Sequence, residues 1–367
     1  MKLYALDYET FFSADYTLKA GKHQHTMEEY IRSERFEAHG AGVVGDGVRR
    51  WMRPDELNEQ FEVWQQHSKR GGEPIALVAH NAQFDGLIAN HHFDYRPDLW
   101  LCTLSMGRVV FGSGLRLGLD HLASYFNLTP KTVPYELFKG KHWHELNSWE
   151  QAAVAEGCLH DAELTLTACS LMLSGGHSAV PYPFPMTEIP VVDLTVRMFT
   201  EPCLVGDLEK LGEAWTQEHR ARADLFERLA DVMGSEITEQ MLRSDDCFAS
   251  MLLEMDVEPA LKMTPKGNEK YAFAKSDYFM QDLVGDDDPD VALLAEARLK
   301  AHSSIYKTRA ERFGFMATRG PLPIYLSYGA AHTRRWGGGD KQNMQNLPRP
   351  DPYRPDKGAL RRAIKAP

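Results

Sequence analysis

LYALDYET, residues 3–10, combines the pattern of a buried strand with two acidic side chains. The apolar run predicts a strand of an internal sheet, and side chains on a strand alternate between its two faces. Asp7 and Glu9 therefore point to the same side. Two like charges this close together repel each other unless a cation lies between them. The stretch thus raises the question of whether the counter-charge is a metal ion, an arginine or only solvent.

The residues around this strand indicate an α/β domain. Residues 38–52 read as a hairpin with a Gly-Asp-Gly turn, and residues 74–81 read as another strand. Helical spacing is found at 55–69 and at 84–93. Strands that alternate with helices predict a mixed sheet flanked by helices. In such sheets, functional sites gather at strand ends and in the loops beyond them.

The second half of the chain has a different pattern. Four prolines within VPYPFPMTEIP, residues 180–190, predict a connector, because prolines at that density break helices and strands. Beyond it, apolar residues recur every three or four positions within 206–234 and 288–317, which predicts a mainly helical region from 190 to 320. Residues 327–367 are rich in Gly and Pro.

The composition of the 367 residues is that of an ordinary globular protein, with 43% apolar and 25% charged residues. No apolar run is long enough to span a membrane and no signal peptide is recognisable, so we expect a cytoplasmic protein without a membrane partner. Five scattered cysteines without a paired motif favour reduced thiols. A net charge of −11 argues against a protein that coats nucleic acid, but basic residues concentrate within 300–365 and predict a phosphate-facing surface there.

Two further acidic residues are expected to lie at the same edge of the sheet as Asp7 and Glu9. Asp85 follows the strand–helix junction HNAQFD, and Asp161 lies in the helical stretch EGCLHDAELT. Each alone is more often a solvated surface group, but together with Asp7 and Glu9 they predict four converging carboxylates. With no fixed arginine opposite, such a cluster requires divalent cations, and all-oxygen ligands favour Mg²⁺ or Mn²⁺. Two such ions are the standard means of directing water at a phosphodiester.

The acidic motifs resemble those of DEDD-type 3′–5′ exonucleases, specifically the proofreading domain of phage-type family A DNA polymerases. The matching motifs are Asp7-x-Glu9, Asn81-x-x-x-Asp85 and Asp161. LCTLSMGRVVF and LDHLASYFNL are similar to segments between the second and third motifs of those enzymes. The resemblance implies a ribonuclease H-like α/β fold and two-metal hydrolysis of single-stranded 3′ ends.

The resemblance also implies a role for each site residue. Asp7 bridges both Mg²⁺ or Mn²⁺ ions, Glu9 and Asp161 complete one ion's site, and Asp85 serves the other. Thr10 and Asn81 contact the terminal nucleotide.

One residue of the family's third motif is missing from this sequence. The family has a Tyr four residues before the last Asp, or in a sister branch a His five before it, and this group orients the attacking water. Gly157 and Glu156 stand at those positions here. His160 should point about 100° away from Asp161 on a helix. Because loss of such a group typically lowers rates by ~10²–10⁴, a DNA-binding scaffold with an impaired exonuclease site is the alternative function.

YGAAHTRRWGGGDKQNMQNLP, residues 328–348, resembles the start of the palm of family A polymerases. The resemblance implies that Arg335, Gln345 and Asn346 lie along a primer–template duplex, whose minor groove offers acceptors common to all base pairs. The helical region, with MFTEP and YAFAKSD, resembles the thumb of phage enzymes of this family. This polymerase-like half makes an RNA-trimming relative of the same superfamily the less favoured function.

The resemblance divides the chain into four parts. These are an exonuclease domain at 1–178, a Pro-rich linker at 179–190, a helical thumb-like domain at 191–325 and an incomplete palm at 326–367. The sequence ends before the family's first polymerase aspartate, so we expect no polymerase activity from this chain alone. We expect a truncated or split polymerase whose palm and fingers reside on a second polypeptide, in a bacterial host cytoplasm if a phage encodes it.

Overall fold

The computed structural model describes residues 1–21, 23–265, 267–303, 305–351 and 358–366. The chain divides into two compact units. Unit 1 comprises Met1–Val205, Arg319–Leu347 and Lys365–Pro367, and unit 2 comprises Gly206–Thr318 and Pro348–Ile364. The segment 179–190 lies within unit 1, and the domain boundaries expected from the sequence stay predictions. Residues 352–357 and 367 of the expected palm segment lie outside the described residues.

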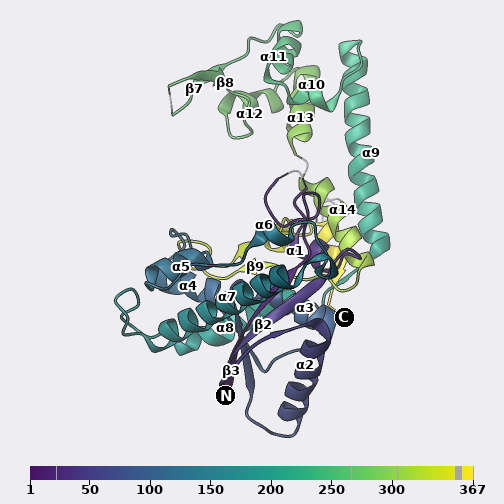
Figure 1. Ribbon diagram of the computed structural model, residues 1–367. Coiled ribbons are helices and arrows are strands. Elements are labelled where there is room, and N and C mark those ends of the chain that lie inside the picture. The colour runs from purple at the N-terminus through teal and green to yellow at the C-terminus, as the bar shows by residue number, and fades with distance from the viewer. Residues whose placement is uncertain (22, 266, 304, 352–357, 367) are drawn as a thin grey trace. The chain divides into compact units, whose positions relative to one another are not determined.

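A five-stranded mixed sheet forms the centre of unit 1 (Figure 1). Its strands are β1 (Lys2–Thr10), β2 (Ala38–Gly45), β3 (Val48–Met52), β4 (Ile75–Ala79) and β5 (Leu99–Cys102). They lie in the order β3-β2-β1-β4-β5, with β1 antiparallel to β2 and parallel to β4. The mixed sheet and the β2–β3 hairpin expected from the sequence are confirmed.

Helices cover both faces of this sheet (Figure 1). Tyr4 of β1 stacks on Trp64 of α2 (Pro54–Lys69), the helix expected at 55–69. Asp7 points to the opposite face, which α7 (Ser148–Ser174) covers. Other α-helices of unit 1 are α1 (Met27–Ile31), α3 (Gln83–Phe93), α4 (Thr103–Phe111), α5 (Leu119–Tyr125), α6 (Tyr135–Phe138) and α8 (Ile189–Thr200).

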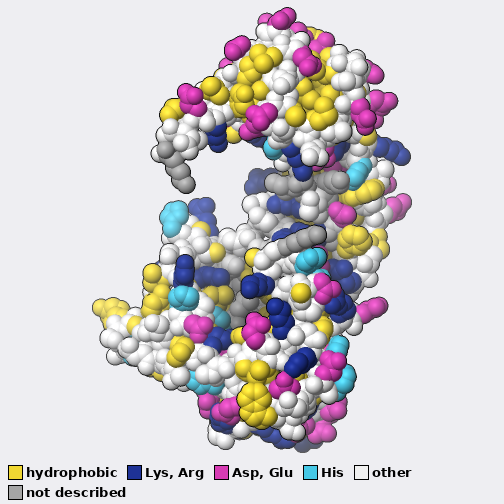
Figure 2. All heavy atoms as spheres, turned by 45° about the horizontal axis from the view of Figure 1, so that its top comes forward, with side chains coloured by type: hydrophobic (Ala, Val, Ile, Leu, Met, Phe, Trp, Pro, Cys, Tyr) yellow, Lys and Arg dark blue, Asp and Glu magenta, His cyan; other side chains and the backbone are white. Residues whose placement is uncertain are grey.

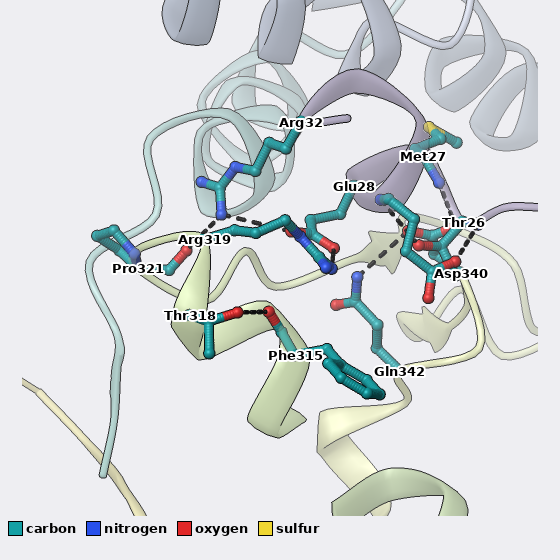
Figure 3. A network of polar contacts seen from close by, with 11 residues as sticks. Thr26, Met27, Glu28, Arg32, Phe315, Thr318, Arg319, Pro321, Asp340 and Gln342 are labelled. Atoms are coloured by element: carbon teal, nitrogen blue, oxygen red, sulfur yellow. Dashed lines mark hydrogen bonds and ion pairs between the residues drawn. The ribbon is translucent and has the colours of Figure 1, made fainter. Parts of the chain in front are cut away.

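Polar contacts join residues 319–347 to α1 (Figure 3). The carboxylate of Glu28, which is completely buried, accepts a hydrogen bond of 2.8 Å from Arg319 Nε. Arg32 lies 3.7 Å from the same carboxylate. Asp340 Oδ1 accepts a 2.9 Å hydrogen bond from the Met27 backbone N–H. These contacts join residues 319–347 to the N-terminal part of unit 1.

Unit 2 is mainly helical, as expected for the middle of the chain. Its longest described helix, α9 (Leu208–Met233), begins at Asp207, whose side chain accepts a hydrogen bond from Lys210 N. The stretch 288–317, for which a helical pattern was expected, forms two helices, α13 (Pro289–His302) and α14 (Ile305–Thr318). At Ser303 the backbone leaves the helical region, with φ −100° and ψ 84°.

The shorter elements of the chain complete the description. They are β6 (Val205–Gly206), α10 (Glu239–Arg243), α11 (Asp245–Glu254), β7 (Leu261–Met263), β8 (Glu269–Tyr271), α12 (Tyr278–Val284), β9 (Leu326–Ser327), β10 (Gly337–Gly338), α15 (Ala359–Arg362) and β11 (Ile364–Lys365). The 3₁₀ turns within the described residues are η1 (Trp143–Glu145), η2 (Met186–Glu188) and η3 (Met344–Asn346).

The surface and the thiols agree with the composition. Figure 2 shows Lys and Arg side chains interspersed with Asp and Glu on the face that it draws. All five cysteines are free, and Cys102, Cys158 and Cys169 are buried. Across the described ranges, no helix combines the length and the apolar character needed to cross a membrane.

Candidate active site

β1 carries Asp7 and Glu9 onto the face covered by α7. The residues opposite them on β2 are Gly42 and Gly40. A Cβ at Gly42 would lie 3.1 Å from the carbonyl oxygen of Cys158 on α7, so glycine there lets the helix approach the sheet closely. Glu9 is only 5% exposed. The Cys158 thiol donates to Asp7 Oδ2 at 3.4 Å, which fixes the carboxylate against the helix.

The junction between β4 and α3 brings Asp85 to the same place. Asp85 lies in the first turn of α3, and its Oδ1 accepts a 3.2 Å hydrogen bond from the Tyr8 backbone N–H of β1. Asn81 precedes it in a left-handed conformation with φ +66°, which Asn tolerates better than most residues. Its buried Oδ1 has no hydrogen-bond partner among the described residues.

Asp161 lies on α7 and is completely buried. Its Oδ2 is 2.7 Å from the Nζ of Lys131. The same ammonium group donates a 2.9 Å hydrogen bond to the hydroxyl of Tyr135. The sequence suggested a metal ion, an arginine or solvent as the counter-charge for the acids. In the structure a lysine supplies part of it. No motif in LTPKTVPYELF marks this lysine, because only the folded loop brings it to Asp161.

A cavity of about 770 Å³ lies over these residues. Five predicted site residues line it, namely Asp7, Glu9, Thr10, Asn81 and Asp85. Asp161 is not among the lining residues. The lining also includes aromatic side chains that sequence reasoning missed, namely Phe12, Tyr30, Phe84 and Tyr135.

Burial and mutual repulsion control the charges of the acids. Burial raises the pKa of Asp7 to about 7, although the charge of Lys131 opposes this rise. Burial and the charge of Asp7 raise the pKa of Glu9 and of Asp85 well above the ordinary range. Burial also raises the pKa of Asp161, against the effect of Lys131. One lysine thus offsets only part of the cost of ionising four acids, and a bound cation would reverse these shifts.

A divalent cation fits this set of donors. Asp7, Glu9 and Cys158 each offer an atom within 4.8 Å of the others. Burial, together with the charge of Asp7, raises the pKa of the Cys158 thiol well above its usual range, so the thiol stays protonated and acts as a donor. The charged ligands are then all carboxylate oxygens, which favour Mg²⁺ or Mn²⁺ over zinc. Asp161 Oδ1, buried without a hydrogen-bond partner among the described residues, leaves a further oxygen available.

The other predicted DNA contacts lie elsewhere in unit 1. Arg335, Gln345 and Asn346 are exposed, and none of them lines the cavity. Gln345 and Asn346 belong to η3. Arg335 follows Arg334, which has φ +57°. Their contact with a primer–template duplex stays a prediction.

His160, adjacent to Asp161, points away from the acids as expected for neighbours on a helix. Its Nε2 lies 3.0 Å from the carbonyl oxygen of Pro130, with which it shares a hydrogen bond. His80 lines the cavity, but burial, followed by the charge of Lys131, lowers its pKa to about 3. A neutral His80 adds no positive charge to the site.

No protein-family model matches the sequence, and no curated protein matches it. Among solved structures, the chain is similar to the POL domain of Pol1 from M. smegmatis in complex with DNA primer-template and dNTP. The two share 19% sequence identity with a TM-score of 0.56, over 89% of this chain and 51% of that chain. This chain therefore spans about half the length of that polymerase domain, and the likeness shows a common fold.

Proposed function

We propose that this chain is a DNA polymerase-related protein whose unit 1 is a metal-dependent 3′–5′ exonuclease acting on single-stranded 3′ ends of DNA. The observation that carries the proposal is the convergence of Asp7, Glu9 and Asp85 on one cavity, next to Asp161 and its partner Lys131. The five-stranded mixed sheet is compatible with a ribonuclease H-like domain. A similar fold in a protein solved with a DNA primer-template supports DNA as the substrate.

Mg²⁺ or Mn²⁺ would be held by the carboxylates of Asp7, Glu9, Asp85 and Asp161. When bound, such ions stabilise the charge that develops on the attacking and the leaving oxygens. The protein's own contribution is to fix the carboxylates. The Tyr8 N–H holds Asp85 and the Cys158 thiol holds Asp7.

The cavity has the chemistry to bind a terminal nucleotide. Its volume of about 770 Å³ is within the range of small-molecule sites. Phe12 and Phe84 offer apolar ring faces on which a base can stack. Thr10 Oγ1, 2.8 Å from the Tyr30 hydroxyl, and the unpaired Asn81 Oδ1 are polar groups for the sugar and base.

The reaction is a hydrolysis of the last phosphodiester. A water oxygen bonds to phosphorus while the bond from phosphorus to the 3′-oxygen of the preceding nucleotide breaks. The water loses a proton to solvent, and the leaving 3′-oxygen takes one up. The products are a nucleoside 5′-monophosphate and a strand one nucleotide shorter.

Release of mononucleotides from a 3′-labelled single strand tests this function. The native chain should release them with Mg²⁺ or Mn²⁺ and stop in EDTA. The Asp7→Ala variant should be inactive, whereas Asp94→Asn, an exposed substitution away from the cavity, should keep full activity. Release that survives Asp7→Ala would place the activity elsewhere.

A DNA-binding scaffold without nuclease activity is the second candidate function. The observation that favours it is Gly157, which stands where the family supplies its water-orienting side chain. Native protein that binds single-stranded DNA but releases no nucleotide under any divalent ion would establish this alternative.

We further propose that the chain works with a polymerase palm and fingers carried by a second polypeptide. The support is the similarity of 89% of this chain to a polymerase domain solved with a DNA primer-template and dNTP. Capture of a palm-bearing partner by the tagged chain, and primer extension by the pair only, would be the expected results. A chain that extends primers alone would contradict this proposal.

A further inference from the structure

Gly157 sits in the middle of α7, where glycine needs a reason, because it destabilises a helix interior by roughly 1 kcal/mol relative to alanine. A Cβ at this position would lie 2.8 Å from the Cα and 3.1 Å from the N of Val133, and 3.3 Å from the Cδ of Pro134. The two nearest of these atoms are backbone, which cannot turn aside as a flexible side chain can. Residues 131–135 therefore occupy the space that a side chain at position 157 would need.

This passage brings two polar side chains to the acids. Lys131, at the start of the segment, lies 2.7 Å from Asp161 Oδ2, and Tyr135, at its end, begins α6. The two are linked, because Lys131 Nζ donates to the Tyr135 hydroxyl at 2.9 Å. The hydrogen bond between His160 and the Pro130 carbonyl attaches the same loop to α7 a second time.

The hydroxyl group of Tyr135 is available to contact a ligand in the cavity. It lines the cavity together with Asp7, Glu9 and Asp85, and its residue is 42% exposed. Its oxygen accepts from Lys131, and among the described residues its own hydrogen has no protein acceptor. The neighbouring Tyr30 hydroxyl is already engaged, since it donates to the Phe11 carbonyl.

We propose that the Tyr135 hydroxyl orients the attacking water in this site, with Lys131 as its positioning residue and Gly157 as the gap that admits their segment. The proposal rests on the exonuclease function proposed above. In this proposal Gly157 is required by the site, because a glycine at this position leaves room for the segment that carries Tyr135.

Tyr135→Phe tests the hydroxyl while it keeps the ring. We expect kcat on a 3′-labelled single strand to fall by about 10²-fold or more, with KM and the affinity for Mn²⁺ measured by paramagnetic resonance unchanged. Lys131→Met should also lower kcat, and the double variant should lose little more than Tyr135→Phe alone, because the lysine acts through the tyrosine. Tyr182→Phe, 80% exposed and outside the cavity, is the matched control and should match the native rate.

Gly157→Ala tests the gap in metal-free protein, without any reaction. The added methyl group should displace the segment, so that an amine-reactive reagent labels Lys131 several-fold faster than in the native chain, as read by peptide mass spectrometry. Gly212→Ala is the matched control, because Gly212 also lies in a helix and a Cβ there meets nothing within 4 Å. In Gly212→Ala, Lys131 should be labelled at the same rate as in the native chain.

The outcomes separate this proposal from the function on which it rests. An active native chain whose rate survives Tyr135→Phe would overturn the proposal and leave the exonuclease function standing. Unchanged labelling of Lys131 in Gly157→Ala would overturn the role of the gap. A native chain that is inactive with both Mg²⁺ and Mn²⁺ would refute the exonuclease function and this proposal with it.

Discussion

The buried carboxylates of the site are expected to lower the stability of the metal-free protein. Asp85 is buried and close to Asp7, and its pKa is raised well above the ordinary range by burial and by that charge. Such groups persist in proteins where a ligand compensates their repulsion. The acidic site is therefore expected to be less stable without a metal ion than an uncharged version of itself.

Asp85→Asn should stabilise the metal-free protein. Asparagine keeps an oxygen for the Tyr8 N–H but removes a charge that the folded state disfavours. We expect a gain of about 1 kcal/mol at pH 8, or a Tm higher by roughly 2–4 °C, measured by calorimetry in EDTA. The same variant should lose exonuclease activity. A lower Tm in EDTA would show that the acids do not repel one another in the folded state.

Asp340 gives a pH dependence that is separate from the acidic site. Burial raises its pKa to about 7, although the N–H groups of Met27 and Glu28 oppose the rise. Because the folded pKa lies above the unfolded value, the folded state binds this proton more tightly. The contribution of Asp340 to stability is therefore greatest at acid pH and is lost as the pH rises through 7.

Thermal melting between pH 5 and 8 measures this effect. Asp340→Asn should lose part of the decline in Tm that the native chain shows over that interval. Asp94→Asn, in which the replaced side chain is 93% exposed, should keep the native pH profile. Parallel profiles for Asp340→Asn and the native chain would show that Asp340 does not titrate in this interval.

At the scale of elements, β1 explains why most of the site was predictable. Its alternation puts Asp7 and Glu9 on one face, and the β4–α3 junction that follows a buried strand adds Asp85. These are local patterns, which can be recognised in the sequence alone. Lys131 and Tyr135 were not predictable, because their position depends on a loop that packs against α7 through Gly157. The break between α13 and α14 was missed because the apolar spacing continues across Ser303.

The contact between α1 and residues 319–347 is also a tertiary feature that no sequence pattern stated. Arg319→Met should leave the completely buried Glu28 with Arg32 as its one remaining ion-pair partner among the described residues. Removing one partner of a buried pair typically costs ~3–5 kcal/mol, so we expect a loss of about 3 kcal/mol in urea unfolding. Glu28→Gln combined with Arg319→Met should recover much of it. Equal stability of the native chain and Arg319→Met would show that this ion pair does not hold the segment.

At the scale of the whole molecule, the acid cluster predicts a dependence on divalent ions. An ion that binds only the folded state stabilises it, by about 2.7 kcal/mol at 100 times its Kd. Mg²⁺ or Mn²⁺ should therefore raise the Tm of the native chain, and EDTA should reverse the rise. Asp85→Asn should respond much less. A Tm that is independent of divalent ions would contradict metal binding by these acids.

The two compact units have separate cores, and the candidate exonuclease site lies wholly within unit 1. The central claim is that the Asp7–Glu9–Asp85 cavity binds divalent ions and a DNA 3′ end. A crystal structure of the chain with Mn²⁺ and a short single strand, phased on the anomalous signal of manganese, tests it most directly. We predict anomalous peaks beside Asp7 with the terminal nucleotide in the cavity. An empty cavity, with manganese or the 3′ end bound elsewhere, would contradict the claim.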